Sequence, residues 1–274
     1  MCIRDRFYSD GTFYVGGHSE TVQIPSIFEF DLSSCTMTKP IYSLAFYDVE
    51  AIAFPVCIEK SCIGDVYGVN DMGLDNSQFF KVNLETGTFQ PLGPVYTGYD
   101  IEGMDIDPFT GRMFAVAGGA GHAGDLFEVN KVTGELKLIG NTGVGDTLDA
   151  LSFHPITGEL WAFQKKFGLV KINIHNAEVT SVWQVQGAGI TDEWDDIAWD
   201  PSGEYLYGIE QRTLYRWDPV SQTAEIVCTD GDLPAPKSEA LAFRIDGTLF
   251  GGGHTEGTPV PSIYQFDPET CTLS

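Results

Sequence analysis

Apolar and polar residues alternate over short stretches along almost the whole chain. The alternation is clear at 79–83 (Phe-Phe-Lys-Val-Asn), 126–130 (Leu-Phe-Glu-Val-Asn) and 169–173 (Leu-Val-Lys-Ile-Asn). A period of two residues is typical of a β-strand that is buried on one face, and no stretch shows the longer period of a helix. We therefore expect an all-β protein built from short strands.

These strands belong to a unit that the chain repeats. Each repeat opens with a similar strand that carries an acidic residue in register: Val-Glu-Ala-Ile-Ala-Phe (49–54), Ile-Glu-Gly-Met-Asp-Ile (101–106), Leu-Asp-Ala-Leu-Ser-Phe (148–153), Trp-Asp-Asp-Ile-Ala-Trp (194–199) and Ser-Glu-Ala-Leu-Ala-Phe (238–243). A turn such as Asp-Pro-Phe-Thr-Gly (107–111) follows, and then three more short strands. Four short strands in about 45 residues are typical of a β-propeller blade.

The second and third strands of the repeats support the same fold. Segments such as Leu-Tyr-Gly-Ile (206–209) and Leu-Tyr-Arg-Trp-Asp (214–218) resemble the Gly-x-Leu-Tyr-x-Ile and Leu-Tyr-x-Ile-Asp-x-x-Thr-Gly units of bacterial secreted β-propeller repeat proteins. The resemblance covers nearly the whole chain and implies the propeller fold. It implies no single function, because propellers host many activities.

The number of blades follows from the number of repeats. We expect one domain over residues 7–274 with six blades, at approximately 7–40, 47–93, 99–140, 146–185, 192–228 and 236–274, the first lacking its inner strand. Five blades, seven blades and a fragment of a longer array are the alternatives. A period of five blades would explain why Asp-Gly-Thr-Phe-Tyr-Val-Gly-Gly-His (10–18) matches Asp-Gly-Thr-Leu-Phe-Gly-Gly-Gly-His (246–254), and why Cys35 matches Cys271, each 236 residues apart.

The charge of the chain narrows its possible partners. It has 39 acidic and 15 basic residues among 274, a formal net charge of −24. Such a surface repels nucleic acid and attracts cations, although a need for solubility also explains it. No apolar run reaches the roughly 18–20 residues of a membrane helix, so we expect no membrane insertion. We also expect a monomer.

The cysteines and the first residues bear on location. Met-Cys-Ile-Arg-Asp-Arg at 1–6 resembles translated sequencing-adapter text in assembled metagenomic sequences, so we expect these residues to be foreign and any signal peptide to be missing. Cys57 and Cys62 can close a small loop, and no zinc-type spacing follows them. We expect a Cys57–Cys62 disulfide and an extracellular or periplasmic protein. Two buried thiols are the alternative, and the pairing of Cys35, Cys228 and Cys271 stays open.

The acidic residues in register are the first candidate site. The first strand of each propeller blade lines the central channel, so we expect a ring at the channel mouth formed by Glu50, Glu102, Asp149, Asp195 and Glu239. Converging carboxylates repel one another and need a cation, shared protons or amide donors. Oxygen ligands suit calcium, which makes calcium a possible cofactor bound by these five residues. In the structural alternative, each carboxylate accepts amide hydrogen bonds and ties its blade to the next.

The loops after the second strands should open on the same face as this ring. The candidate residues there are His18, His122, His254, Asn70, Asp71, Glu210 and Gln211. Histidine can bind a metal or act as a base, but duplication of a repeat also explains its recurrence. We further expect Asp107 to cap its turn. Most tryptophans should lie between blades, whereas Trp183 and Trp194 could be exposed for stacking.

The chain carries no phosphate-binding loop, nucleophile elbow or triad motif. We therefore expect no catalytic residues and a secreted or surface-exposed binding module, whose partner is a protein, a glycan or a small molecule on the channel-mouth face. The alternative is a calcium-dependent, lactonase-like hydrolase that uses the acidic ring. The two hypotheses differ in symmetry. An enzyme needs one distinct cluster around its metal, whereas a scaffold bonds every acid alike.

Overall fold

The expected all-β architecture is confirmed by a computed structural model, which describes residues 13–19, 22–31, 36–43, 48–54, 65–73, 75–83, 88–144, 148–165, 167–187, 189–191, 193–229, 237–255 and 258–273. These residues form five four-stranded sheets and one three-stranded sheet. A short 3₁₀ turn at Ala120–His122 is the helical element of the described part.

Each four-stranded sheet is an antiparallel blade whose strands follow one another along the chain. Blades one and two consist of β4 (Asp48–Ala53), β5 (Asp65–Asp71), β6 (Asn76–Asn83) and β7 (Thr88–Thr97), then β8 (Ile101–Ile106), β9 (Met113–Ala117), β10 (Asp125–Val129) and β11 (Leu136–Asn141). Blade three consists of β12 (Leu148–Phe153), β13 (Leu160–Gln164), β14 (Gly168–Ile172) and β15 (Val179–Trp183). Blades four and five consist of β16 (Asp196–Trp199), β17 (Leu206–Glu210), β18 (Thr213–Asp218) and β19 (Thr223–Cys228), then β20 (Lys237–Phe243), β21 (Leu249–Thr255), β22 (Thr258–Asp267) and β23 (Thr272–Leu273).

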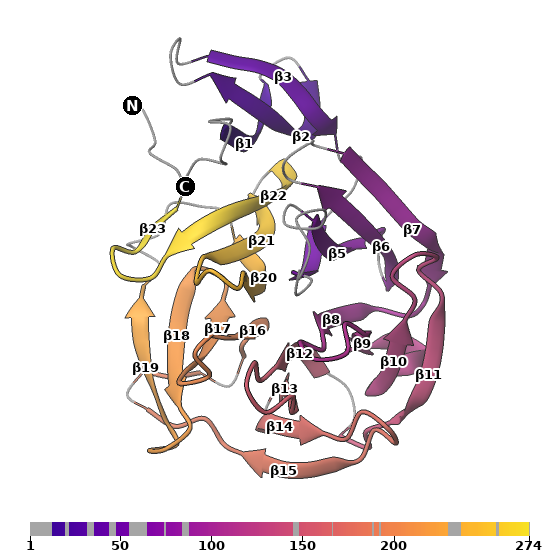
Figure 1. Ribbon diagram of the computed structural model, residues 1–274, viewed down its shortest axis with the longest axis vertical. Helices are drawn as coiled ribbons and strands as arrows, with labels where there is room; N and C mark the ends of the chain where they lie inside the picture. Colours follow the sequence, from indigo (N-terminus) through magenta and orange to yellow (C-terminus); the bar gives the residue numbers. More distant parts are fainter. Residues whose placement is uncertain are drawn as a thin grey trace.

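The five blades form a closed ring around a central channel (Figure 1). The first strand of each blade lies innermost, and these inner strands contact one another in a cycle: β4 with β8, β8 with β12, β12 with β16, β16 with β20, and β20 with β4. The remaining strands of each blade lie progressively farther from the channel. The channel is therefore lined by the strands that carry the acidic residue of each repeat.

The prediction of six blades is wrong, and the five-bladed alternative is what the structure shows. The first sheet consists of β1 (Phe13–Ser19), β2 (Val22–Asp31) and β3 (Thr36–Ser43). It lies outside the ring, next to β22 and β7 (Figure 1). A blade joins the ring through its inner strand, and in the described part of the chain this sheet has none. Because β20 packs directly against β4, the ring closes without it.

Hydrophobic clusters fill the spaces between neighbouring blades. One cluster joins Val69 and Phe79 of blade one to Met104 and Phe127 of blade two. Others join blades two and three, three and four, and four and five. The closing junction has the same construction, with Ile52, Phe80 and Val82 of blade one packed in one cluster with Ala240 and Phe250 of blade five. Each blade is thus held by the apolar faces of both neighbours.

Tryptophans form the densest of these junctions, between blades three and four. The Trp161 ring lies 4.7 Å from Trp183, 5.3 Å from Trp199 and 5.6 Å from Trp217, measured between ring centroids. The expectation that Trp183 and Trp194 are exposed is wrong. Trp194 is fully buried, and Trp183 is half-buried because it stacks on Trp161.

The space that Trp194 needs is provided by a glycine. Its ring lies between those of Phe163 and Tyr215, with centroids 5.1 and 5.2 Å away. A Cβ atom at Gly208 would approach the Trp194 ring to 2.1 Å, which no side chain tolerates. Glycine at this place in β17 therefore allows an inter-blade aromatic stack.

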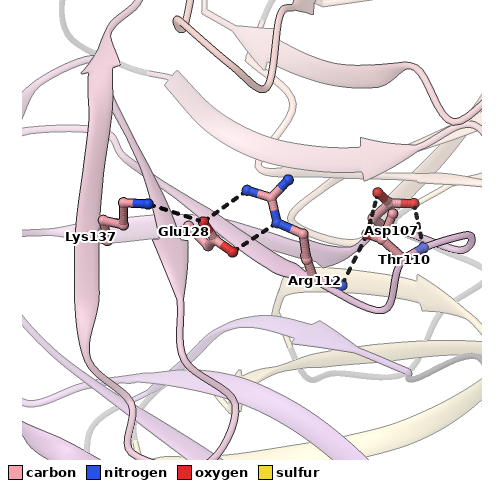
Figure 2. Close-up of polar contacts among 5 residues, drawn as sticks. All are labelled: Asp107, Thr110, Arg112, Glu128 and Lys137. Carbon is pink, nitrogen blue, oxygen red and sulfur yellow. Dashed lines mark hydrogen bonds and ion pairs between the residues drawn. The ribbon is translucent and has the colours of Figure 1, made fainter.

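The turn between the first two strands of blade two has the expected cap. Asp107 Oδ1 accepts a hydrogen bond from Phe109 N at 2.8 Å. Its Oδ2 accepts one from Thr110 Oγ1 at 2.5 Å, and Figure 2 shows these two residues side by side. Figure 2 also shows Arg112, whose Nε and Nη2 each donate to Glu128 at 2.8 Å. Lys137 Nζ lies 3.9 Å from the same carboxylate, so an ion-pair network crosses this blade.

A disulfide joins the last two blades. Cys228 ends β19 and Cys271 lies between β22 and β23, with their Cα atoms 5.6 Å apart. The bond connects the outer strand of blade four to the last hairpin of blade five. The predicted Cys57–Cys62 disulfide and residues 1–6 lie outside the described residues.

Replacing Trp161 with alanine should destabilise the ring, because Trp183, Trp199 and Trp217 lose a packing partner and a cavity remains. Large aromatic-to-alanine substitutions in cores cost about 3–5 kcal/mol, so we expect the free energy of unfolding in urea to fall by about this amount. The control is Val220→Ala, at a side chain that is 92% exposed; it should change this free energy by less than about 0.5 kcal/mol. Equal losses in the two variants would contradict the role of the tryptophan cluster.

Candidate functional site

The acidic residue of each repeat lies at an irregularity of its inner strand. The pairing between the first two strands of a blade skips one residue in four blades, namely Glu50, Glu102, Asp149 and Glu239. In blade four, Asp195 directly precedes β16, and its backbone N–H donates to Ile209 O at 2.7 Å. A β-bulge gives its extra residue a direction that the regular alternation does not allow. The repeated acids thus come from the same end of each inner strand, and this end is bulged in four of the five blades.

Glu102 and Asp100 perturb each other's pKa. Burial raises the pKa of Glu102 well above its ordinary value, and repulsion from Asp100 and Asp149 raises it further. The interaction between the two carboxyl groups raises the pKa of Glu102 and lowers that of Asp100, whose pKa is nevertheless raised by burial and by Asp75 and Asp71. The raised pKa values indicate that negative charge exceeds the available counter-charge here.

Lys165 neutralises the next part of the ring. Its Nζ lies 2.9 Å from Asp149 Oδ2 and 3.3 Å from Asp195 Oδ1. Burial alone would lower the pKa of Lys165, but the two carboxylates raise it, so the ammonium stays charged. Burial nevertheless raises the pKa of Asp149 to about 6, and Asp195 and Asp100 add to the rise against the effect of Lys165. Asp195 Oδ2 also accepts a hydrogen bond from Gln211 N at 3.1 Å.

Two glycines make room for the carboxyl groups. A Cβ atom at Gly118 would lie 2.5 Å from Glu102 Cγ and 2.8 Å from Asp149 Oδ1. A Cβ atom at Gly119 would lie 2.2 Å from Asp100 Oδ2. Three carboxyl groups therefore pack against the bare backbone that follows β9, where any other residue would displace them.

The cluster continues across the junction of blades five and one. Burial raises the pKa of Asp71, and repulsion from Glu239 and Asp75 raises it further, although Gly73 N donates to Asp71 Oδ1 at 2.8 Å. The neighbouring Asn70 is only 2% exposed. Its Nδ2 donates to Met72 Sδ at 3.2 Å, while its buried Oδ1 has no hydrogen-bond partner. A buried amide oxygen without a donor is costly and is suited to accepting one from a ligand.

An acid recurs in every blade, but the residues at the adjoining position of the second strand differ. The residue after each acid pairs with a residue of the second strand. Two positions beyond that partner, blades one to five carry Asp71, Gly118, Lys165, Gln211 and His254. Sequence reasoning compared the loops of Asp71 and Gln211 but missed Lys165, which the same alignment would have found. It also missed Asp100, although Asp48 and Glu193 stand at the same place, two residues before the acids of blades one and four. The mouth is therefore symmetric in its acids and asymmetric in their partners.

The candidate histidines are not brought together in one loop. His122 lies in the 3₁₀ turn after β9, stacks on the Tyr99 ring at 3.9 Å and places Nδ1 3.0 Å from Asp125 Oδ2. His254 lies in β21 of the ring, and His18 lies in β1 outside it. Glu210 is engaged within its own blade, accepting hydrogen bonds from Thr191 Oγ1 and, at 3.1 Å, from the Tyr215 hydroxyl.

The opposite end of the channel is apolar. A cavity of about 200 Å³ there is lined by residues from all five inner strands. Between it and the acidic mouth lies one apolar side chain per inner strand, two residues after each acid, and each is at most 2% exposed: Ile52, Met104, Leu151, Ile197 and Leu241. The charged mouth and the apolar cavity are therefore separated by a packed layer.

Hydrogen bonds that tie blades together come from other residues of the inner strands. Asp105 Oδ2 accepts from Phe153 N, and Asp196 Oδ2 accepts from Leu241 N, each at 2.6 Å. Ser152 Oγ likewise accepts from the backbone N–H of the next inner strand, at 2.9 Å. Burial raises the pKa of Asp105 to about 7 and that of Asp196 well above its ordinary value. These side chains thus tie one inner strand to the next, and the structural alternative for the ring acids stays a prediction.

The described residues include no group of three His, Cys, Asp or Glu side chains positioned to hold a metal ion. The calcium set of Glu50, Glu102, Asp149, Asp195 and Glu239 therefore stays a prediction, and the side chain of Glu50 lies outside the described set. No helix of the described residues is long and apolar enough to cross a membrane.

The charge of Glu102 predicts a pH dependence of stability. Because its pKa is raised in the folded state, its favourable contribution is complete below the unfolded pKa of about 4.3 and is lost as pH rises through the folded pKa. Glu102→Gln keeps a donor toward Asp100 without the charge. We expect its melting temperature to exceed that of the wild type at pH 8, by about 2–4 °C for each kcal/mol relieved, and the difference to disappear near pH 4.5.

The control for this experiment is Glu204→Gln, which makes the same change of net charge at an exposed side chain. It should follow the wild type over the whole pH range. If the two variants melt alike at pH 8, Glu102 is not under the repulsion described here.

No protein-family model matches the chain, and no curated protein matches its sequence. Among solved structures, it is similar to a structural genomics protein of unknown function from Bacteroides thetaiotaomicron VPI-5482, with a TM-score of 0.62 and 13% identity, covering 91% of this chain and 65% of that one. It also matches Kuenenia stuttgartiensis hydrazine synthase, with a TM-score of 0.45 and 14% identity, covering 64% of this chain and 48% of that one. The chain thus spans 65% of the length of the Bacteroides protein. At these identities the first likeness shows the β-propeller fold and nothing finer.

Proposed function

We propose that this chain is a non-catalytic binding module of an extracellular or periplasmic protein, and that its acidic channel mouth receives a cationic group of the ligand. The observation that carries the proposal is the imbalance of charge at the mouth. Asp71, Asp100, Glu102 and Asp149 all have raised pKa values, and Lys165 is the cation paired with this cluster among the described ion pairs. A second cation would relieve the repulsion that contributes to these raised pKa values.

The asymmetry of the mouth supports one place for that cation. Lys165 already occupies the side of Asp149 and Asp195. On the other side, Asp71 and Asp100 repel each other, and Gly119 beside Asp100 brings no side chain of its own. An ammonium or guanidinium group fits there, since it would pair with carboxylates and could also donate to the unsatisfied oxygen of Asn70.

The cysteines support the proposed location. The Cys228–Cys271 disulfide is the kind of bond that persists outside the cytosol. The net charge of −24 favours cationic molecules and basic protein surfaces as partners and disfavours nucleic acid. The calcium-dependent hydrolase stays an alternative prediction that the same experiment tests.

The proposal is tested by titrating the full chain with n-butylammonium, a hexalysine peptide and calcium chloride at constant ionic strength. Because charge-assisted hydrogen bonds contribute about 1.5–3 kcal/mol, Asp100→Asn should weaken binding of the two organic cations about ten-fold or more. The matched control is Glu269→Gln, an exposed acid on the last turn of blade five with the same change of charge. Equal affinity in the two variants would show that the acidic surface, and not the mouth, attracts the cation.

The calcium arm separates the two functions. Calcium binding that Asp100→Asn abolishes, together with calcium-dependent opening of a lactone substrate, would replace the binding module by the hydrolase. Binding of the organic cations without turnover is the result expected from the binding module.

A further inference from the structure

The three-stranded sheet outside the ring has an unused edge. In the described part of the chain, β1 pairs with β2 on one side and with no strand on the other. In blade five, the equivalent strand β21 has the inner strand β20 on that side. The sheet of β1–β3 is thus a blade that lacks the strand by which blades join the ring.

This sheet has the same pairing register as the outer part of blade five. Phe13 pairs with Phe30 as Leu249 pairs with Phe266, and each pair is 236 residues from its counterpart. The same offset holds for the remaining pairs, up to Ser19 with Val22 and Thr255 with Thr258. Pairing is irregular at His18 in one hairpin and at His254 in the other. The third strands agree as well, with Phe30 opposite Met37 and Phe266 opposite Leu273.

The chain connection also fits a place in blade five. In blades one to four, the outermost strand leads into the inner strand of the next blade, as β7 leads into β8. Blade five is followed around the ring by blade one, whose inner strand is β4. The strand that directly precedes β4 is β3, which ends at Ser43, five residues before Asp48. With β1–β3 as outer strands of blade five, the connection from blade five to blade one would match all the others.

We propose that β1–β3 is a second set of outer strands for blade five, and that the edge of β1 is a docking site for β20. In this closure β1 takes the place of β21, so that Phe13 lies opposite Phe243 and Tyr14 opposite Ala242, as Leu249 and Phe250 do now. The inner strands and the first four blades keep their places. The ring has the same five blades in either closure.

The disulfide marks which closure is present. Cys228 lies in blade four, which is common to both, and its partner Cys271 belongs to the outer part of blade five. Cys35, which lies outside the described residues, stands 236 positions before Cys271 in the sequence. Exchange needs no oxidant: the Cys35 thiolate attacks Cys228 Sγ, the Cys35–Cys228 bond forms, the Cys228–Cys271 bond breaks, and Cys271 leaves as a thiolate.

The first test is the disulfide map of full-length Cys271→Ser, folded in a glutathione redox buffer in which oxidised glutathione accepts the electrons. The expected result is a Cys35–Cys228 peptide found by mass spectrometry after digestion of the folded protein. The matched control is Cys35→Ser, which should retain the Cys228–Cys271 bond. A folded Cys271→Ser protein whose Cys228 is alkylated as a free thiol would overturn the proposal.

A second pair of variants keeps the test valid if Cys271→Ser fails to fold. Directly opposite Cα atoms in antiparallel strands are about 4.5–5.5 Å apart, within the range that a disulfide spans. Tyr14→Cys with Ala242→Cys should form a bond within one chain in the proposed closure, and Phe250→Cys with Ala242→Cys reports the observed one. Cross-linking of the second pair alone would overturn the proposal, as would a 14–242 bond found only between two chains.

Discussion

Packing of β20 against β4 is the contact on which the rest of this structure depends. A propeller blade buries its two faces only against its neighbours, so an open row of blades leaves an apolar face exposed at each end. The junction of Ile52, Phe80 and Val82 with Ala240 and Phe250 buries both ends at once. Closure also fixes the channel, because it brings Glu239 of the last inner strand within interaction range of Asp71 of the first blade. Both the core and the acidic mouth therefore require this contact.

Much of the fold could be read from the sequence, because it is local. Each repeat contains its own strands and turns, so the alternation of residues and the cap at Asp107 predict them without knowledge of neighbours. The register of the acids could be read for the same reason, although the bulge that directs them could not. The blade count could not be predicted, since it depends on which two copies meet when the ring closes. The sequence does contain the relevant hint in the 236-residue match of the first and last repeats, but a match does not say which copy enters the ring.

The site was harder to predict for a related reason. Repeated residues are visible in one sequence, whereas their partners at the mouth are particular to single blades. Lys165 belongs to this second group, and it determines which carboxylates are paired with a cation. The roles of Asp105 and Asp196 were also hidden, because a carboxylate that accepts a backbone N–H from the next strand looks the same in sequence as one that faces a ligand. Burial, which raises the pKa in both cases, is a property of the assembled ring.

The acidic mouth is compatible with both closures, because the two sets of outer strands carry matching residues. Glu239 lies on β20, which both closures share, so the ring of acids is unchanged. His254 lies near the end of the second strand of blade five in the observed closure. The residue 236 positions earlier, which would take that place in the other closure, is also a histidine, His18. This place in blade five therefore carries the same residue type in both closures. An exchange of outer strands would alter the covalent link of blade five while leaving the charges of the mouth as they are.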